Sequence, residues 1–191
     1  MSERPSNTFA GANRAYLSLG SNIGPEQNLP AAVRALAGFG RVLAVSRVWE
    51  SAPLANPTEA LRSSGQAAAF SRGAGANFLN AAVLLETDLS AEGLYDEAIA
   101  IVEGRLGRVR DPRDKYAPRT IDIDLSLFNH DVLEVGAHRI PDPDIVKRAF
   151  VAVPLAELDP GYRHPVTGQT LGEIAAALQS DLAPRADVRL L

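Results

Sequence analysis

The sequence predicts an α+β protein built on a ferredoxin-like βαββαβ sandwich, with additional strand and helix elements at its C-terminal end. Three observations lead to this class. Several segments are rich in alternating or β-branched apolar residues, and two segments between them carry apolar residues at helical spacing. Glycine, proline and asparagine separate most of these segments. Their order along the chain is strand, helix, strand, strand, helix, strand.

The first three elements occupy the N-terminal quarter. Residues 14–19 (RAYLSL) alternate and are followed by Gly20-Ser21-Asn22, which is typical of a strand that ends in a turn. Residues 28–39 place leucine, valine and alanine at helical spacing and are expected to form a helix that Gly38 and Gly40 end. Residues 41–49 are rich in valine and favour a second strand.

The next stretch interrupts the pattern. Residues 51–77 are rich in alanine, serine, glycine and proline, and a loop of this length is usually a functional lid or a disordered segment. Within it, residues 58–62 are compatible with a short helix. Residues 78–86 (FLNAAVLLE) favour a third strand. A helix is then expected from an N-cap at Ser90 to about Leu106.

A highly charged loop, residues 107–118, precedes the fourth expected strand at residues 119–128. Residues 131–135 are expected to form a fifth strand, paired to the fourth through a turn at Asn129-His130. The remaining expected elements are a turn or short helix over residues 141–148, a last strand over 149–153 and a C-terminal helix over 170–178.

Composition limits the classes of function. The 191 residues fit one domain, expected over residues 14–191 after a disordered tail at 1–13. The net charge of −4 argues against a protein that coats nucleic acid, and the chain has no cysteine for a disulfide or thiolate site. The polar start lacks the apolar core of a signal peptide, and no run approaches the length of a membrane helix. We therefore expect a cytoplasmic protein without membrane or nucleic-acid partners.

Two carboxylates stand out in the fourth strand. The segment Arg119–Phe128 alternates, so that Asp122 and Asp124 share one face and the isoleucine and leucine side chains share the other. Two carboxylates about 6.5–7 Å apart on one face repel each other unless a positive charge lies near them. Oxygen-only ligands suit Mg²⁺. The alternative is a solvated polar face on an edge strand.

A basic loop favours the metal interpretation. Five cations precede or flank the pair, namely Arg108, Arg110, Arg113, Lys115 and Arg119. Arginine forks bind phosphate oxygens well, and a basic loop beside a metal site suits a polyphosphate ligand. The chain has no GxxxxGK[ST] or GxGxxG motif, so metal and arginine are expected to hold the phosphates.

Five motifs in this order resemble the 6-hydroxymethyl-7,8-dihydropterin pyrophosphokinase family. They are Tyr16–Asn22 (YLSLGSN), Phe78–Ala82 (FLNAA), Gly107–Arg110 (GRVR), Ala117–Asp124 (APRTIDID) and Arg148–Phe150 (RAF) followed by Pro154-Leu155. The resemblance covers about residues 14–160, and APRTIDID is its most specific block. It implies an enzyme of folate biosynthesis that binds ATP with two Mg²⁺ ions. The pterin hydroxymethyl oxygen would attack the β-phosphorus in line and release AMP.

The resemblance also implies roles for individual residues. Asp122 and Asp124 would bind the metals, and Arg108 and Arg119 would act in catalysis. ATP would contact Arg108, Arg110, Arg119, Arg148 and Leu125. The pterin would contact Pro53, Leu54, Phe78, Asn80, Tyr116 and Phe150. Glu103 matches an acidic position of the family on the helix before the basic loop, where a salt bridge to a loop arginine is the simpler expectation.

The chain departs from the family pattern at several positions. The loop aromatic is Tyr116 in place of tryptophan, and Pro141-Asp142 stands where the family has Pro-His. Asp142 would repel a triphosphate unless it meets a metal or an arginine, and His138 is the nearest histidine in the sequence. Ala100 replaces a frequent glutamine, and the pocket loop over residues 55–77 is unusually long.

Two alternatives to an active kinase follow from the residues. The first is a catalytically weak paralogue that binds pterin or nucleotide without turnover, which Asp142 and Ala100 motivate. The second is an RNA-binding module, since RRM domains share the ferredoxin-like topology. The acidic net charge and the aspartate pair on the strand face argue against RNA binding. Protein partners and the oligomeric state are not predictable from these patterns.

Overall fold

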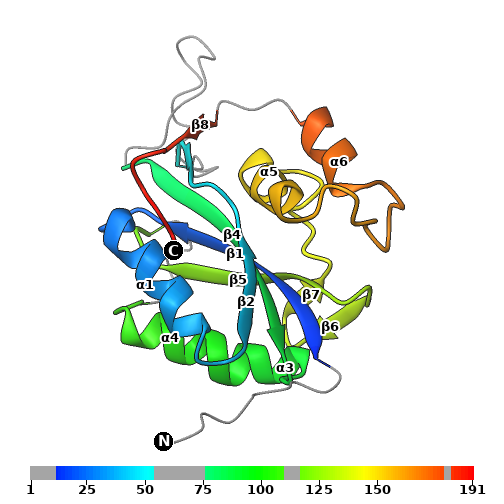
Figure 1. The fold of residues 1–191 in the computed structure, drawn as a ribbon, viewed down its shortest axis with the longest axis horizontal. Coiled ribbons are helices and arrows are strands. Elements are labelled where there is room, and N and C mark those ends of the chain that lie inside the picture. The colour runs from blue at the N-terminus through cyan, green and yellow to red at the C-terminus, as the bar shows by residue number, and fades with distance from the viewer. Residues whose placement is uncertain (1–11, 54–75, 110–116, 179–181) are drawn as a thin grey trace, which may run out of the picture.

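An antiparallel sheet forms the middle layer of this computed structural model, which describes residues 12–53, 76–109, 117–178 and 182–191 (Figure 1). The strands are β1 (Asn13–Ser21), β2 (Arg41–Val45), β3 (Trp49–Ser51), β4 (Phe78–Thr87), β5 (Asp122–Phe128), β6 (Leu133–Val135), β7 (His138–Ile140) and β8 (Ala183–Pro184). The main sheet has the order β5-β1-β4-β3-β8, and β2 also pairs with β4. β6 and β7 form a separate hairpin.

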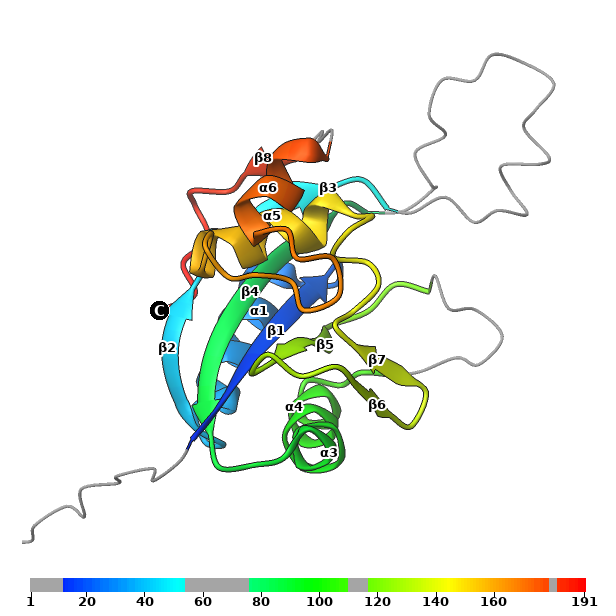
Figure 2. The same cartoon turned by 90° about the vertical axis from the view of Figure 1, so that its right-hand side faces the viewer.

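Helices cover both faces of the sheet (Figure 2). They are α1 (Pro25–Leu36), α3 (Ala91–Gly93), the π-helical segment η1 (Leu94–Ile99), α4 (Ala100–Arg105), α5 (Ala149–Leu158) and α6 (Leu171–Ala177). The helix run α3-η1-α4 lies with α1 on one face, while α5 and α6 lie on the other. None of the helices in the described ranges is long and apolar enough to cross a bilayer.

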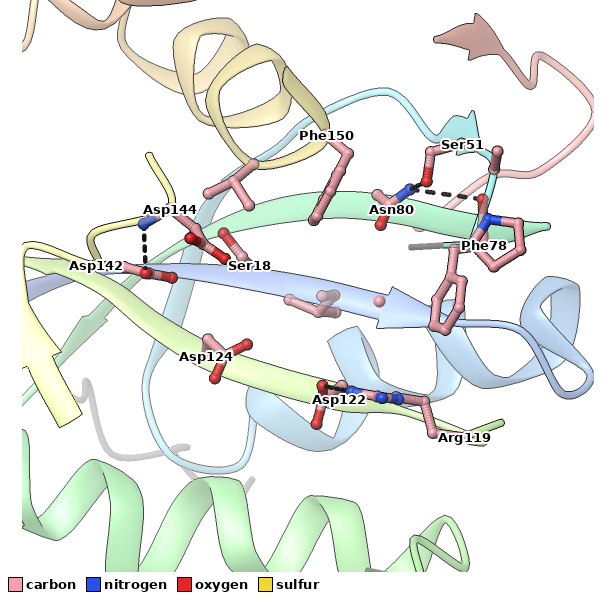
Figure 3. A pocket seen from close by; sticks show the side chains of 15 residues that line it. Ser18, Ser51, Phe78, Asn80, Arg119, Asp122, Asp124, Asp142, Asp144 and Phe150 are labelled. Carbon is pink, nitrogen blue, oxygen red and sulfur yellow. Dashed lines mark hydrogen bonds and ion pairs between the residues drawn. The ribbon is translucent and has the colours of Figure 1, made fainter. Parts of the chain in front are cut away.

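The alternation of β5 determines which core each side chain enters. Ile121, Ile123 and Leu125 are at most 2% exposed and belong to the larger core, together with buried residues of α1 and α4. The opposite face of the sheet packs against α5 and α6 in a second core that contains Tyr16 and Leu155. Asp122 and Asp124 occupy this second face, and α5 lies above the carboxylates (Figure 3).

Most expected elements are present with shifted ends. The predicted strand over 41–49 is two strands in the structure, β2 and β3, with residues 46–48 between them. The predicted strand over 119–128 begins only at Asp122. The expected C-terminal helix is α6, whose N-cap Thr170 forms a capping box with Glu173. Residues 1–11 of the expected tail and the expected helix at 58–62 lie outside the described residues, and Asn13 already belongs to β1.

Two predictions of strands were wrong. Residues 131–135 do not pair with β5; β6 pairs with β7 instead, through a tight turn in which Gly136 has a φ of 58°. Residues 149–153 belong to α5, not to a strand. The run Ala149–Val153 is apolar on every side because α5 is packed between the sheet and α6, and such a run does not distinguish a buried helix from a buried strand.

Candidate active site

A cavity opens on the second face of the sheet, below the start of α5 (Figure 3). β1, β4 and β5 provide its floor, and the segment after β3 and the segment before α5 provide its walls. Its lining consists of Ser18, Leu19, Gly20, Ser51, Ala52, Pro53, Phe78, Asn80, Arg119, Asp122, Asp124, Asp142, Asp144, Phe150 and Val151. The cavity therefore has an aromatic and amide end and a carboxylate end.

The aspartate pair lies at the carboxylate end, as the alternation predicts. Strand register places Asp122 opposite Gly20 and Asp124 opposite Ser18. Gly20 has no side chain, and Ser18 is small, so the neighbouring strand leaves space beside both carboxylates. Asp122 and Asp124 line a cavity and do not form an open, solvated face.

Two arginines converge on Asp122. Arg119 Nη1 donates to Asp122 Oδ2 at 2.5 Å, and Arg108 Nη2 donates to Oδ1 at 3.3 Å. The side chains of Arg108 and Arg119 are only 9% and 15% exposed. The turn after β1 fixes Arg119, because Asn22 Oδ1 accepts from the Arg119 amide at 2.7 Å. The SLGSN motif thus holds one of the cations of the site.

Asn80 defines the other end of the cavity. It is 5% exposed, and its Nδ2 donates to Ser51 Oγ at 2.9 Å and to the Trp49 carbonyl at 3.2 Å. Part of the amide therefore has a structural role, as a buried amide requires. Among the described residues Oδ1 accepts no hydrogen bond, which leaves it available to a ligand N–H group.

Apolar and aromatic groups surround that amide. Phe78 and Phe150 both line the cavity, from β4 and from the first turn of α5, and Pro53 adds a third apolar wall. The guanidinium of Arg119 lies 5.7 Å from the centre of the Phe78 ring. A flat heterocycle with N–H donors fits such walls, because its faces pack on rings and its edge meets the amide.

Asp142 and Asp144 bring two more carboxylates to the cavity. The Asp142 amide donates to the Ser126 carbonyl at 2.9 Å, and Asp142 Oδ1 accepts from the Asp144 amide at 2.9 Å. Burial raises the pKa of Asp142, and the hydrogen bond from the Asp144 amide opposes this shift. Asp142 therefore lines the same cavity as Asp124, and its repulsion of a triphosphate stays a prediction.

A second and a third cavity meet the first at Asp124. The second lies between the η1-α4 helix and the β6-β7 hairpin, and its lining includes Ala100, Glu103, Arg108 and Asp124. The third joins Asp124 to Asp142 and also reaches Leu125. Asp124 lines all three cavities. β5 ends the order of paired strands in the sheet, which explains why cavities on both sides reach this residue.

The π-helical segment shapes the boundary between the second and third cavities. Tyr95 in η1 stacks on His138 of β7, with ring centres 4.3 Å apart and an interplanar angle of 20°. Burial raises the pKa of Tyr95, and the charge of Asp124 adds to this effect. A π-turn often occurs at functional sites because it changes the direction of side chains within a helix. His138 therefore has a packing role against the Tyr95 ring.

Glu103 has a structural contact of its own. It is 4% exposed, and its Oε1 accepts from the Ile123 amide at 2.9 Å. This bond satisfies a backbone donor on the outer side of β5. This contact is with a backbone amide. The expected salt bridge to a loop arginine stays a prediction, and Arg108 lines the same cavity as Glu103.

The donor chemistry of the site fits Mg²⁺. No group of three or more histidine, cysteine, aspartate or glutamate side chains in the described part of the chain is arranged to enclose a metal ion. Mg²⁺ usually takes one or two protein carboxylates and completes its shell with water and phosphate oxygens. Asp122 and Asp124 supply that number of carboxylates from one strand face.

Several residues that were expected to contact a ligand do not line a cavity with their side chains, or lie outside the described residues. Arg148 is exposed at the N-cap of α5 and lines none of the three cavities. The Leu125 side chain is 1% exposed in the core, so only its backbone is available at the third cavity. Leu54, Arg110 and Tyr116 lie outside the described residues, as do Arg113 and Lys115.

Several lining residues were missed by sequence reasoning, among them Ser18, Gly20, Asp144 and Tyr95. Ser18 and Gly20 alternate on one strand face, which was a usable signal once β1 was paired with β5. Asp144 lies two residues after Asp142 and follows it into the cavity through the hydrogen bond between them. Tyr95 gave no usable signal, because its direction depends on the π-turn.

Comparisons with known proteins show which family the chain is similar to. The sequence model of the 7,8-dihydro-6-hydroxymethylpterin-pyrophosphokinase (HPPK) family matches residues 16–160. A 2-amino-4-hydroxy-6-hydroxymethyldihydropteridine pyrophosphokinase of Pseudomonas aeruginosa is 35% identical over 167 residues, which cover 86% of this chain and 91% of the relative. The protein of the same name from Methylorubrum extorquens is 36% identical over 168 residues, covering 86% and 93%.

Solved structures show a similar fold. An HPPK-DHPS triple mutant of Plasmodium falciparum superimposes with a TM-score of 0.62 at 15% identity over 89% of this chain. This chain spans only 45% of the length of that protein, so the likeness concerns one part of it. At this identity the superposition supports the mixed α/β fold with its antiparallel sheet.

Proposed function

The chain belongs to the 7,8-dihydro-6-hydroxymethylpterin-pyrophosphokinase family, and from this premise we propose that it transfers the pyrophosphoryl group of ATP to 6-hydroxymethyl-7,8-dihydropterin in folate biosynthesis. The hydroxymethyl oxygen attacks the β-phosphorus of ATP. The bond from that phosphorus to the oxygen bridging to the α-phosphorus breaks, AMP leaves, and the hydroxyl proton is released. One observation carries the proposal: the aromatic-amide cavity and the groove beside α4 meet at Asp124.

We assign the pterin to the first cavity. Asn80 Oδ1 would accept from the pyrimidine edge of the pterin, while its Nδ2 stays bonded to Ser51. Phe78, Phe150 and Pro53 would contact the ring system. With its ring there, the pterin would direct its substituent along the cavity toward Asp122 and Asp124. Leu54 and Tyr116 remain predicted pterin contacts.

We assign ATP to the groove formed by the second and third cavities. Arg108 lines this groove and Arg119 lines the first cavity, so both guanidinium groups flank the place where the two substrates meet. In the free protein both guanidinium groups bind Asp122. When ATP binds, phosphate oxygens would replace the Asp122 carboxylate as their anionic partner. The backbone of Leu125 is available to the nucleotide at the third cavity. Arg110 and Arg148 remain predicted ATP contacts.

Asp122 and Asp124 would hold the two Mg²⁺ ions that the family resemblance implies. When bound, these ions would neutralise charge on the polyphosphate and orient it for in-line attack. The residues of the chain position the two substrates: the arginines hold phosphate oxygens, and Asn80 with the aromatic rings holds the acceptor. Such positioning accounts for a large share of catalysis in phosphoryl transfer.

A catalytically weak paralogue is the second candidate. Asp142 and Asp144 add negative charge to the cavity that also holds Asp122 and Asp124, and Ala100 offers no polar contact in the nucleotide groove. Incubation with ATP, Mg²⁺ and the pterin alcohol distinguishes the two candidates. We expect AMP and pterin pyrophosphate in equal amounts. No AMP above the level of an Asp122→Asn/Asp124→Asn double variant would exclude the kinase.

We further propose that the main sheet is ferredoxin-like. The order β5-β1-β4 with β2 and β3 on the far side of β4 supports this assignment, because all of these neighbours are antiparallel. In this interpretation α5, α6 and β8 are additions. The cytoplasmic location and the single domain expected from the sequence remain predictions.

A further inference from the structure

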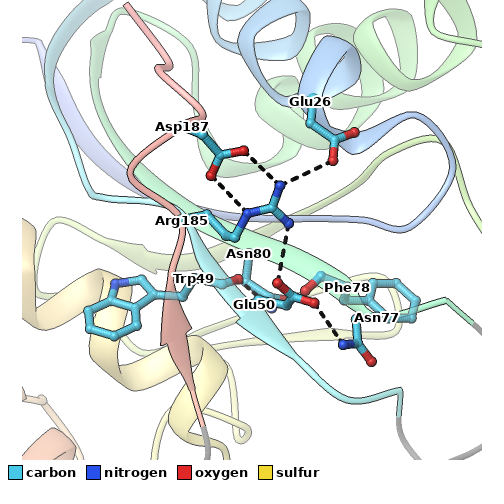
Figure 4. A network of polar contacts seen from close by, with 8 residues as sticks. All are labelled: Glu26, Trp49, Glu50, Asn77, Phe78, Asn80, Arg185 and Asp187. Carbon is cyan, nitrogen blue, oxygen red and sulfur yellow. Dashed lines mark hydrogen bonds and ion pairs between the residues drawn. The ribbon is translucent and has the colours of Figure 1, made fainter.

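Arg185 lies near the C-terminus and joins three parts of the fold (Figure 4). Its Nη1 donates to Glu50 Oε2 of β3 at 3.2 Å, and its Nη2 lies 3.5 Å from Glu26 Oε1 of α1. Its Nε and Nη2 also donate to both oxygens of Asp187, at 2.9 and 2.8 Å. Arg185 lies beyond residues 16–160, the span that the family model matches.

The segment that carries Arg185 is packed into the structure. β8 pairs with β3, and the Arg185 amide donates to the Val48 carbonyl at 2.9 Å. Val188 and Leu190 are 9% and 5% exposed and belong to the larger core. The guanidinium therefore starts from a fixed backbone, which lowers the conformational entropy lost when it binds its carboxylates.

Glu50 connects this network to the acceptor cavity. Its Oε1 accepts from Asn77 Nδ2 at 2.7 Å, immediately before β4 begins with Phe78. The hydrogen bond from Asn77, followed by that from Arg185, lowers the pKa of Glu50. Glu50 therefore ties the end of β3 to the beginning of β4.

The same two strand ends carry the residues that line the cavity. Ser51 lies opposite Phe78 and Trp49 lies opposite Asn80 in the β3-β4 register. Asn80 Nδ2 is held by the Ser51 hydroxyl and the Trp49 carbonyl, so a shift of β3 would rotate the amide. β3 has only three residues, and its outer neighbour β8 has two, so backbone pairing alone gives this edge little support.

We infer that Arg185 is a positioning residue for the pterin: through Glu50 and Asn77 it holds β3 against β4 in the register that directs Asn80 and Phe78 into the acceptor cavity. The inference rests on the proposed function, because it identifies the occupant of that cavity as the pterin. Arg185 touches neither substrate, so its loss should weaken acceptor binding and leave the chemistry at Asp122 and Asp124 unchanged.

The test compares Arg185→Ala with Arg41→Ala. Arg41 of β2 also makes an ion pair with a glutamate of the sheet, Glu86 of β4, and neither residue lines the cavity. For each variant we would measure kcat, KM for both substrates, and Kd for the pterin by titration in the presence of a non-hydrolysable ATP analogue and Mg²⁺. We expect Arg185→Ala to raise KM and Kd for the pterin at least fivefold, with kcat and KM for ATP within twofold. Arg41→Ala should change none of these values more than twofold.

Two further variants keep the inference testable. Arg185→Lys retains the charge but not the fork of donors, so it should recover part of the pterin affinity that Arg185→Ala loses. Glu50→Gln keeps an oxygen that can accept from Asn77 but loses the ion pair, so it should weaken pterin binding in the same direction. It decides the matter if Arg185→Ala does not fold. A pterin Kd within twofold of wild type in Glu50→Gln and in folded Arg185→Ala would overturn the inference, as would an equal loss in Arg41→Ala. Absence of turnover in the wild type would overturn the proposed function instead, while the pterin titration would still test Arg185.

Discussion

Arg119 donates to Asp122 at the carboxylate end of the first cavity, with Nη1 and Oδ2 2.5 Å apart. One residue assigned to the phosphates therefore neutralises one residue assigned to the metals. The bond holds the guanidinium beside the two carboxylates of the first cavity. Substrate binding then requires an exchange of partners at Asp122, and the predictions below test the two sides of this exchange separately.

Asp122→Asn and Asp124→Asn should each lower kcat at least about 100-fold, because each removes one anionic ligand from the charge-neutralising centre. For Asp122→Asn we also expect the free energy of unfolding to fall by about 1 kcal/mol, since two partly buried arginines lose their carboxylate. Steady-state kinetics and urea unfolding measure the two effects. Retention of more than half of the wild-type kcat in either variant would contradict the assignment of the pair.

Arg119→Ala should lower kcat at least about 100-fold, because the guanidinium is expected to bind phosphate oxygens in the transition state. Kd for the pterin should change less than fivefold, since Arg119 lies at the carboxylate end of the cavity and its guanidinium lies 5.7 Å from the centre of the Phe78 ring. Arg119→Lys should restore part of kcat, because lysine keeps the charge but not the fork. If Arg119→Ala weakened pterin binding and left kcat intact, Arg119 would be an acceptor residue instead.

Gly20→Ala should affect pterin binding and protein stability in opposite directions. A Cβ at Gly20 would lie 3.7 Å from Asn80 Oδ1 and 3.9 Å from Phe78 Cδ1, which are ordinary contact distances. Alanine should stabilise the strand by about 0.5–1 kcal/mol, because glycine loses more conformational entropy on folding. The methyl group nevertheless occupies the cavity floor, so KM for the pterin should rise severalfold while KM for ATP stays within twofold. Equal KM values for the pterin in both proteins would place the acceptor elsewhere.

The sequence was sufficient to predict those parts of the site that depend on local periodicity. Alternation alone placed Asp122 and Asp124 on one face, and both line the same cavity. Register was not available from the sequence, so Ser18 and Gly20 were missed although they lie directly across from the two aspartates. Arg185 and Glu50 are 135 residues apart, and no local pattern predicts such a contact.

The incorrect prediction of a strand at residues 149–153 also arose because the contacts that decide it are distant in the sequence. A short apolar run reports that a segment is buried, and the choice between helix and strand depends on which neighbours bury it. Here α6 and the sheet enclose the run on both sides, so a helix that is apolar all round is stable. The shape of the cavity depends on this outcome, because Phe150 reaches the cavity from the first turn of α5.

Asp142→Asn should make the protein more stable at neutral pH. Burial raises the pKa of Asp142 above its ordinary value of 3.8, so the folded state holds this proton more tightly than the unfolded state does. The resulting stabilisation of the wild type is complete below pH 3.8 and is lost as pH rises through the raised folded-state pKa. Asparagine keeps the oxygen that accepts from the Asp144 amide, so that hydrogen bond survives the substitution.

The free energy of unfolding of the two proteins should therefore diverge with pH. The advantage of Asp142→Asn should be smallest near pH 3.5, grow as pH rises, and then stay constant, with about 1.4 kcal/mol for each unit by which the pKa is raised. Urea unfolding from pH 3.5 to pH 7.5 measures this profile. Asp88→Asn is the matched control, because Asp88 is exposed and the same change of charge there should give no such divergence.

Asp142→Asn should also lower KM for ATP severalfold at pH 7.5, since one negative charge beside the polyphosphate is gone. A flat difference in stability together with an unchanged KM for ATP would show that Asp142 neither carries a buried charge nor faces the phosphates.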